Sequence, residues 1–106
     1  AKRFENEKGT NPEELVGAAH AACYSMALSL FAANAGFELE SVDTTASVTL
    51  EQKDGGFAVT RIHLDVVAKL PRASAEQFAK IAEDTKANCP ISKLLKAEIT
   101  LNARLA

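Results

Sequence analysis

Two cysteines are the side chains of this 106-residue chain best suited to covalent chemistry. Cys23 lies within a long apolar stretch, and Cys89 lies far along the chain, directly before Pro90. Their separation matches no metal-ligand spacing, and His20 and His63 do not complete a metal site. The absence of a Cys-x-x-Cys pair disfavours a disulfide reductase. Two interpretations stay open: two reduced, buried thiols that only pack, or a reactive pair.

The local setting of each cysteine favours reactivity. Pro90 suits the first position of a short helix, so Cys89 is its expected N-cap, where unpaired N–H groups and the helix dipole stabilise a thiolate. Cys23 lies in mid-helix, so a cation from another segment would have to stabilise its thiolate. Arg3, in the polar arm before the helix, is the best candidate because a guanidinium is always charged and binds two oxygens at once. Glu13, in the helix's first turn, could orient it.

Two thiols on separate elements fit a thiol peroxidase, in which a thiolate becomes a sulfenic acid and the second thiol condenses with it to a disulfide. The competing hypothesis is a noncatalytic small-molecule-binding or stress-associated structural dimer of the same fold. Thiol titration of the native protein separates the two, because only the peroxidase requires a fast-reacting cysteine.

Residues 11–36 are predicted to form the helix that carries Cys23. Asn11 suits the N-cap, Pro12 the first helical position, and Gly36 the stop. The helix is apolar nearly all round, so we expect it to be central and covered on several sides. Its length approaches that of a membrane span, but its many alanines and the lack of flanking basic clusters argue against one.

Other side chains of this helix receive structural or substrate roles. His20 shares a face with Cys23, but a thiolate paired with arginine needs no imidazole, so we expect a structural or interface histidine. Met26 and Tyr24 lie close enough to Cys23 in sequence to favour lipophilic substrates. Met26 and Phe31 are nevertheless expected mainly in the core.

The rest of the chain predicts two strands, two helices and a last strand. Residues 42–51 and 57–69 alternate in polarity as an antiparallel hairpin, with a bulge near Thr60 and His63 on the polar face. Ser74 and Gln77 form a capping-box pattern at the start of a second helix, and residues 97–105 alternate as a strand. This order indicates an α+β domain, an antiparallel sheet packed on the long helix.

Composition excludes some partners. The net charge is −2 and no basic run occurs, so nucleic acid is not expected. Residues 1–12 contain no apolar leader, so we expect a cytoplasmic protein without a signal peptide. A single domain spanning residues 1–106 is expected.

Two runs carry a specific resemblance to a known family: GTNPEELVGAAHAACYSMALSL at residues 9–30 and NCPISKLLKAEITL at residues 88–101. Together they resemble the OsmC branch of the OsmC/Ohr organic hydroperoxide reductases. The resemblance implies that Cys23 is the peroxidatic thiol, Cys89 the resolving thiol, Arg3 the catalytic arginine and Glu13 its partner.

The same resemblance implies an intertwined homodimer with its active sites at the subunit interface, an organic hydroperoxide as substrate and a thiol as reductant. No metal, haem or flavin is implied. Family members carry further N-terminal strands, which this chain is expected to lack.

Overall fold

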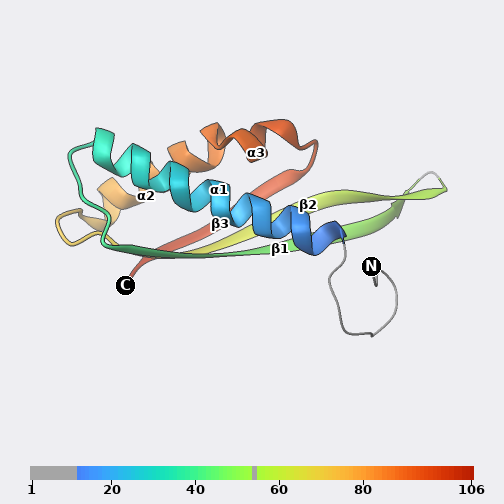
Figure 1. Ribbon diagram of the computed structural model, residues 1–106, viewed down its shortest axis with the longest axis horizontal. Coiled ribbons are helices and arrows are strands. Elements are labelled where there is room, and N and C mark those ends of the chain that lie inside the picture. Colours follow the sequence, from blue (N-terminus) through green and yellow to red (C-terminus); the bar gives the residue numbers. More distant parts are fainter. Residues whose placement is uncertain (1–11, 54) are drawn as a thin grey trace.

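The computed structural model describes residues 12–53 and 55–106. Its elements follow in the order α1 (Pro12–Asn34), β1 (Ser41–Lys53), β2 (Gly56–Lys69), α2 (Ala75–Asn88), α3 (Pro90–Leu94) and β3 (Glu98–Leu105). The three strands form one sheet, and the helices lie together on one of its faces (Figure 1). The expected Asn11 cap and the arm with Arg3 lie outside the described residues.

The predicted end of the long helix is confirmed. Gly36 has a φ of +90°, a left-handed conformation that costs glycine little. Its N–H donates to the carbonyl of Ala33 at 3.0 Å, and the N–H of Phe37 donates to that of Ala32 at 2.9 Å. This pair of bonds is a Schellman motif, which satisfies the last carbonyls of the helix.

The predicted hairpin and its bulge are also confirmed. Strands β1 and β2 pair antiparallel, with Thr49 opposite Arg61 but Leu50 opposite Val59. Thr60 is therefore the extra residue of a bulge, at the position where the polarity pattern slips by one. Gly55 in the turn has a φ of +79°.

The last strand differs from the expected antiparallel sheet. β3 lies beside β2 in parallel, from Arg61 opposite Glu98 to Ala68 opposite Leu105. Parallel neighbours need a crossover connection of about a dozen residues or more, and residues 70–97, with α2 and α3, supply one. Only the β1–β2 half of the sheet is antiparallel.

The second helix begins as predicted. The Gln77 N–H donates to the Ser74 hydroxyl at 3.1 Å, and the Ser74 N–H donates to the Gln77 side chain at 2.9 Å, which completes the capping box. Its buried residues lie on one side of the helix: Phe78, Ile81, Ala82 and Thr85.

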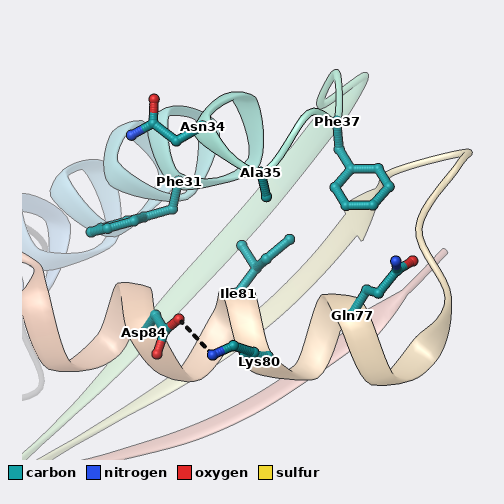
Figure 2. Close-up of a pocket in the computed structure, with 8 residues that line it drawn as sticks. All are labelled: Phe31, Asn34, Ala35, Phe37, Gln77, Lys80, Ile81 and Asp84. Carbon is teal, nitrogen blue, oxygen red and sulfur yellow. Dashed lines mark ion pairs between the residues drawn. The ribbon is translucent and has the colours of Figure 1, made fainter.

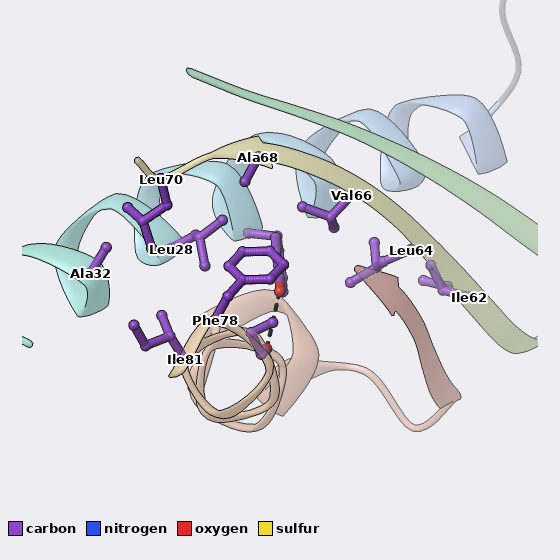
Figure 3. Packing of buried hydrophobic residues seen from close by; sticks show 11 residues of the cluster. Leu28, Ala32, Ile62, Leu64, Val66, Ala68, Leu70, Phe78 and Ile81 are labelled. Atoms are coloured by element: carbon purple, nitrogen blue, oxygen red, sulfur yellow. Dashed lines mark hydrogen bonds between the residues drawn. The ribbon is translucent and has the colours of Figure 1, made fainter. Parts of the chain in front are cut away.

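The core lies between the sheet and the two long helices. Phe78 and Ile81 of α2 face Leu28 and Ala32 of α1 and the inner side of β2 (Figure 3). Gly17 marks the closest approach of α1 to β1, because a Cβ there would lie 3.1 Å from a methyl carbon of Val48.

The described residues, 12–53 and 55–106, cover α1 on one face only. Its buried positions are Gly17, His20, Tyr24, Leu28 and Ala32. Leu15 and Leu30 are each 61% exposed and Met26 is 76% exposed, so the expected covering on several sides is not found and Met26 is not a core residue. The expected core position of Phe31 fits better, since that side chain is half-buried against the cluster.

By length and composition alone, α1 could cross a membrane. The core helix of a globular domain passes the same test. The buried positions of α1 recur at three- and four-residue steps and pack on the sheet and α2. This one-sided stripe is the pattern of a helix held against a core.

Candidate active site

The two cysteine sulfurs lie 3.0 Å apart, with the Cys89 thiol donating to the Cys23 sulfur. Both are free thiols; Cys23 is partly exposed and Cys89 is fully buried. A disulfide needs a sulfur–sulfur distance of about 2.05 Å, so a small side-chain movement would suffice to form one. The fold thus brings together two residues from distant parts of the sequence.

Cys89 is positioned by two helices at once. Its N–H donates to the carbonyl of Thr85 at 2.8 Å as α2 ends, and its carbonyl accepts from Lys93 at 3.1 Å as α3 begins. Pro90 occupies the first turn of α3, as predicted, and the Cys89 side chain makes no capping hydrogen bond. The thiol is therefore directed at Cys23 rather than at its own helix.

An apolar cleft of about 620 Å³ opens beside Cys23. The described residues that line it carry no charge: Ala19, Cys23, Met26, Ala27, Leu30, Pro90 and Ile91. Two helices form it: the open face of α1 is one wall, and the start of α3 is the other. The buried Cys89 lies behind Cys23, so a molecule in the cleft meets Cys23 first.

Burial raises the pKa of the Cys23 thiol above its ordinary value of 9.0, and the hydrogen bond with Cys89 raises it further. A backbone hydrogen bond from Ile91 acts in the opposite direction. A nucleophilic thiol reacts as its thiolate, so a positive charge near Cys23 would increase its reactivity near neutral pH.

His20 and Tyr24 flank Cys23 in sequence but lie on the packed face of α1. The His20 ring is fully buried, its Nε2 lies 2.7 Å from the Ser92 hydroxyl, and burial lowers its pKa. The Tyr24 hydroxyl donates to the carbonyl of Ala82 at 3.0 Å. The expected structural role of His20 fits this position, whereas Tyr24 is not available to a substrate.

A second hollow lies between the end of α1 and α2 (Figure 2). It measures about 410 Å³, and Phe31, Phe37 and Ile81 give it an apolar floor. Lys80 and Asp84 lie on its α2 side and form an ion pair, with Lys80 Nζ 3.9 Å from Asp84 Oδ2. It contains neither cysteine, so the cleft beside Cys23 is the better candidate for chemistry.

Comparison with known proteins identifies the family. The family model described as OsmC-like protein matches residues 5–104. The chain belongs to the OsmC-like family. It is 57% identical over 103 residues to peroxiredoxin OsmC of Escherichia coli (strain K12), covering 97% of this chain and 72% of that protein.

More distant OsmC-like proteins match over nearly the same length. The organic hydroperoxide resistance protein OhrB of Bacillus subtilis (strain 168) is 29% identical over 102 residues, which are 95% of this chain and 73% of OhrB. The crystal structure of an organic hydroperoxide resistance protein from Elizabethkingia anophelis superposes with a TM-score of 0.82 at 27% identity, covering 96% of this chain and 73% of that one. The mixed α+β fold is therefore the OsmC-like fold.

The four site residues predicted from sequence fall in three places. Cys23 and Cys89 meet, and Arg3 lies outside the described residues. Glu13 lies in the first turn of α1, beside a small hollow formed with Ala46 of β1. Ten residues of helix separate it from Cys23 by about 15 Å along the axis, so the fold of one chain does not bring these two together.

Sequence reasoning missed the α3 side of the site. Pro90 and Ile91 form one wall of the cleft, and Ser92 reaches His20. Their position directly after Cys89 was a usable signal, since any segment that brings Cys89 to Cys23 carries its next residues along. Among the residues that the structure describes, no group of three or more His, Cys, Asp or Glu side chains is placed to hold a metal ion.

Proposed function

We propose that this OsmC-like chain is a cysteine-based peroxidase that reduces organic hydroperoxides to alcohols through a Cys23 sulfenic acid and a Cys23–Cys89 disulfide. Membership of the family, with relatives named peroxiredoxin and organic hydroperoxide resistance protein, makes the chain a peroxide-reducing oxidoreductase. The observation that carries the finer proposal is the thiol pair, 3.0 Å apart at the side of an apolar cleft.

The reaction has two steps on the protein. The Cys23 thiol gives up its proton and its sulfur attacks the terminal oxygen of the hydroperoxide; the O–O bond breaks, the alkoxide leaves and takes up that proton as the alcohol, and Cys23 carries a sulfenic acid. The Cys89 sulfur then attacks the Cys23 sulfur; the S–O bond breaks, and the hydroxyl leaves with the Cys89 proton as water. A thiol reductant returns both cysteines to thiols, which suits a reducing compartment such as the cytoplasm.

The different burial of the two cysteines supports the proposed order of their reactions. Cys23 faces the cleft and is partly exposed, whereas Cys89 is buried behind it. A hydroperoxide group therefore reaches Cys23 before it could reach Cys89. The buried thiol is in turn the group best placed to condense with the new sulfenic acid.

The lining of the cleft favours hydroperoxides with an apolar substituent. Burying apolar surface gains about 25 cal/mol per Å², and Met26, Leu30 and Ile91 offer such surface. Hydrogen peroxide has no alkyl group to bury and gains nothing from it. We expect alkyl or aryl hydroperoxides to react faster.

The charge that activates Cys23 is proposed to come from Arg3, with Glu13 to orient it; because Glu13 lies about 15 Å along α1 from the Cys23 of its own chain, this arrangement requires an active site at the subunit interface. Burial raises the Cys23 pKa, and the described cleft residues supply no cation to lower it. A guanidinium near the sulfur would stabilise the thiolate and could also bind the hydroperoxide oxygens. The peroxidase is proposed to be a homodimer, in which a second copy covers the exposed apolar face of α1 formed by Leu15, Met26 and Leu30.

The test is a single turnover. Reduced protein is mixed with one equivalent of cumene hydroperoxide or hydrogen peroxide, and free thiols are counted with time. The wild type should lose both thiols of each chain, faster with cumene hydroperoxide. Cys89→Ser should lose one and accumulate a trappable sulfenic acid, and Cys23→Ser should lose none. No thiol loss in the folded wild type would refute the proposal, and equal rates would refute the substrate preference.

A further inference from the structure

Two contacts between side chains join α1 to the segment that follows α2. The first is the sulfur pair of Cys23 and Cys89, and the second is the contact between His20 Nε2 and the Ser92 hydroxyl at 2.7 Å. His20 precedes Cys23 by three residues and Ser92 follows Cys89 by three, so the links lie about one helical turn apart on both elements. The short helix thus runs back along α1 with its hydroxyl beside the imidazole.

Apart from these two contacts and the backbone hydrogen bond from Ile91 to Cys23, little fixes α3 against α1. It has five residues, none of them buried, and the Cys89 side chain supplies no cap. Leu94, at its end, is 74% exposed. A helix this short has no stability of its own, so its position depends on the tertiary contacts of its first turn.

The His20 side of the second link is held rigidly. The ring is fully buried on the packed face of α1, and its Nδ1 has no hydrogen-bond partner among the described residues. The Ser92 hydroxyl therefore supplies the hydrogen bond that the structure shows for this ring. Removing it would leave the imidazole buried with both nitrogens unpaired, which costs more than losing an exposed hydrogen bond.

We propose that His20 and Ser92 are positioning residues that hold α3 so that the Cys89 sulfur stays in contact with Cys23, and that they set the rate of disulfide formation. The inference rests on the proposed peroxidase cycle and concerns its second step only. In that step the Cys89 S–H and the Cys23 S–O bonds break, the S–S bond forms and water leaves. Neither residue touches the reacting atoms.

The variant that tests this is Ser92→Ala, with Ser92→Thr as the conservative variant that keeps the hydroxyl. Thr44→Val is the matched control. The Thr44 hydroxyl of β1 forms a similar 2.8 Å hydrogen bond with the Ser25 hydroxyl of α1. This bond joins α1 to the sheet and not to α3. The Thr44→Val substitution therefore removes a comparable interaction without loosening Cys89.

Rapid-mixing kinetics with excess cumene hydroperoxide separate the two steps. The first phase depends on peroxide concentration and the second does not. Ser92→Ala should slow the second phase about tenfold, the effect of one lost hydrogen bond, and leave the first unchanged. More Cys23 sulfenic acid should be trapped by dimedone. Ser92→Thr and Thr44→Val should match the wild type in both phases.

A second measurement needs no peroxide. The equilibrium between the thiol pair and its disulfide is measured in glutathione buffers, and Ser92→Ala should shift it about tenfold towards the dithiol, because a loosened Cys89 has a lower effective concentration at Cys23. An unchanged equilibrium and second phase, or equal losses in Thr44→Val, would overturn the proposal. If the wild-type thiols do not react with peroxide but Ser92→Ala shifts the equilibrium between thiols and disulfide, the proposed peroxidase function is refuted and the positioning role stands.

Discussion

The two faces of α1 contradict the simple rule that the more apolar side of a helix is buried. The packed face carries the polar rings of His20 and Tyr24, both fully buried. The open face carries Leu30 and Met26, which are 61% and 76% exposed. Exposing such side chains while burying polar ones is unfavourable unless the exposed surface is used.

Polarity on the packed face is compensated by specific partners. The Tyr24 hydroxyl donates to the carbonyl of Ala82, and the His20 ring meets the Ser92 hydroxyl. The open face has a reactive thiol in its centre and an apolar lining around it. One face is therefore built for fixed hydrogen bonds within the chain, and the other for an apolar body that comes from outside it.

The sharpest test of this contrast compares two leucines two positions apart. Leu28→Ala should lower the free energy of unfolding by about 2–5 kcal/mol, because it leaves a cavity in the core. Leu30→Ala should change it by less than about 1 kcal/mol in the single chain. Urea denaturation at several protein concentrations measures both. A cost at Leu30 that grows with protein concentration would support the proposed homodimer, in which a second copy covers the open face, and a large cost that is independent of concentration would contradict the contrast between the two faces.

The lining of the cleft is tested by Met26→Ser. Removing this apolar side chain should slow the reaction with cumene hydroperoxide by roughly fivefold to tenfold, while the reaction with hydrogen peroxide changes little. Thiol loss under matched conditions gives both rates. Ala33→Ser, on an exposed position of α1 outside the cleft lining, is the control. An equal slowing with both peroxides would show that Met26 acts on the thiol rather than on the substrate.

The packed face is tested by Tyr24→Phe. The change keeps the ring and removes the hydroxyl that donates to Ala82, so the free energy of unfolding should fall by about 1 kcal/mol. The rate of thiol oxidation should stay the same, since the hydroxyl lies away from the cleft. Chemical denaturation and single-turnover kinetics on the same sample check both parts. A large rate effect would contradict the separation of the two faces.

The smallest expected effect is the pH dependence of stability through His20. Burial lowers its pKa below 6.5, so the unfolded chain binds this proton more readily than the folded one. The folded protein is therefore most stable above the pKa that His20 has in the unfolded chain. Its free energy of unfolding falls progressively as the pH drops below that pKa. Unfolding experiments between about pH 8 and pH 5 should show a shallower decline in His20→Gln, with His63 common to both proteins.

Local structure in this chain was readable from local chemistry. The Gly36 stop, the Ser74–Gln77 capping box and the bulge at Thr60 are each decided by a few adjacent residues, and each is confirmed. The parallel pairing of β3 was not predicted, because strand direction depends on how a long connection crosses the sheet rather than on the strand's own alternation.

The features of the candidate site likewise divide into those readable from the sequence and those decided by the tertiary structure. The identity of the two cysteines and the position of Cys89 before Pro90 belong to the sequence, and they were enough to suggest thiol chemistry. Their 3.0 Å contact belongs to the tertiary structure, because it joins segments that α2 and the sheet bring together. The exposure of Met26 and the burial of Tyr24 were likewise set by packing, since on a helix apolar nearly all round only the neighbouring elements decide which face is covered.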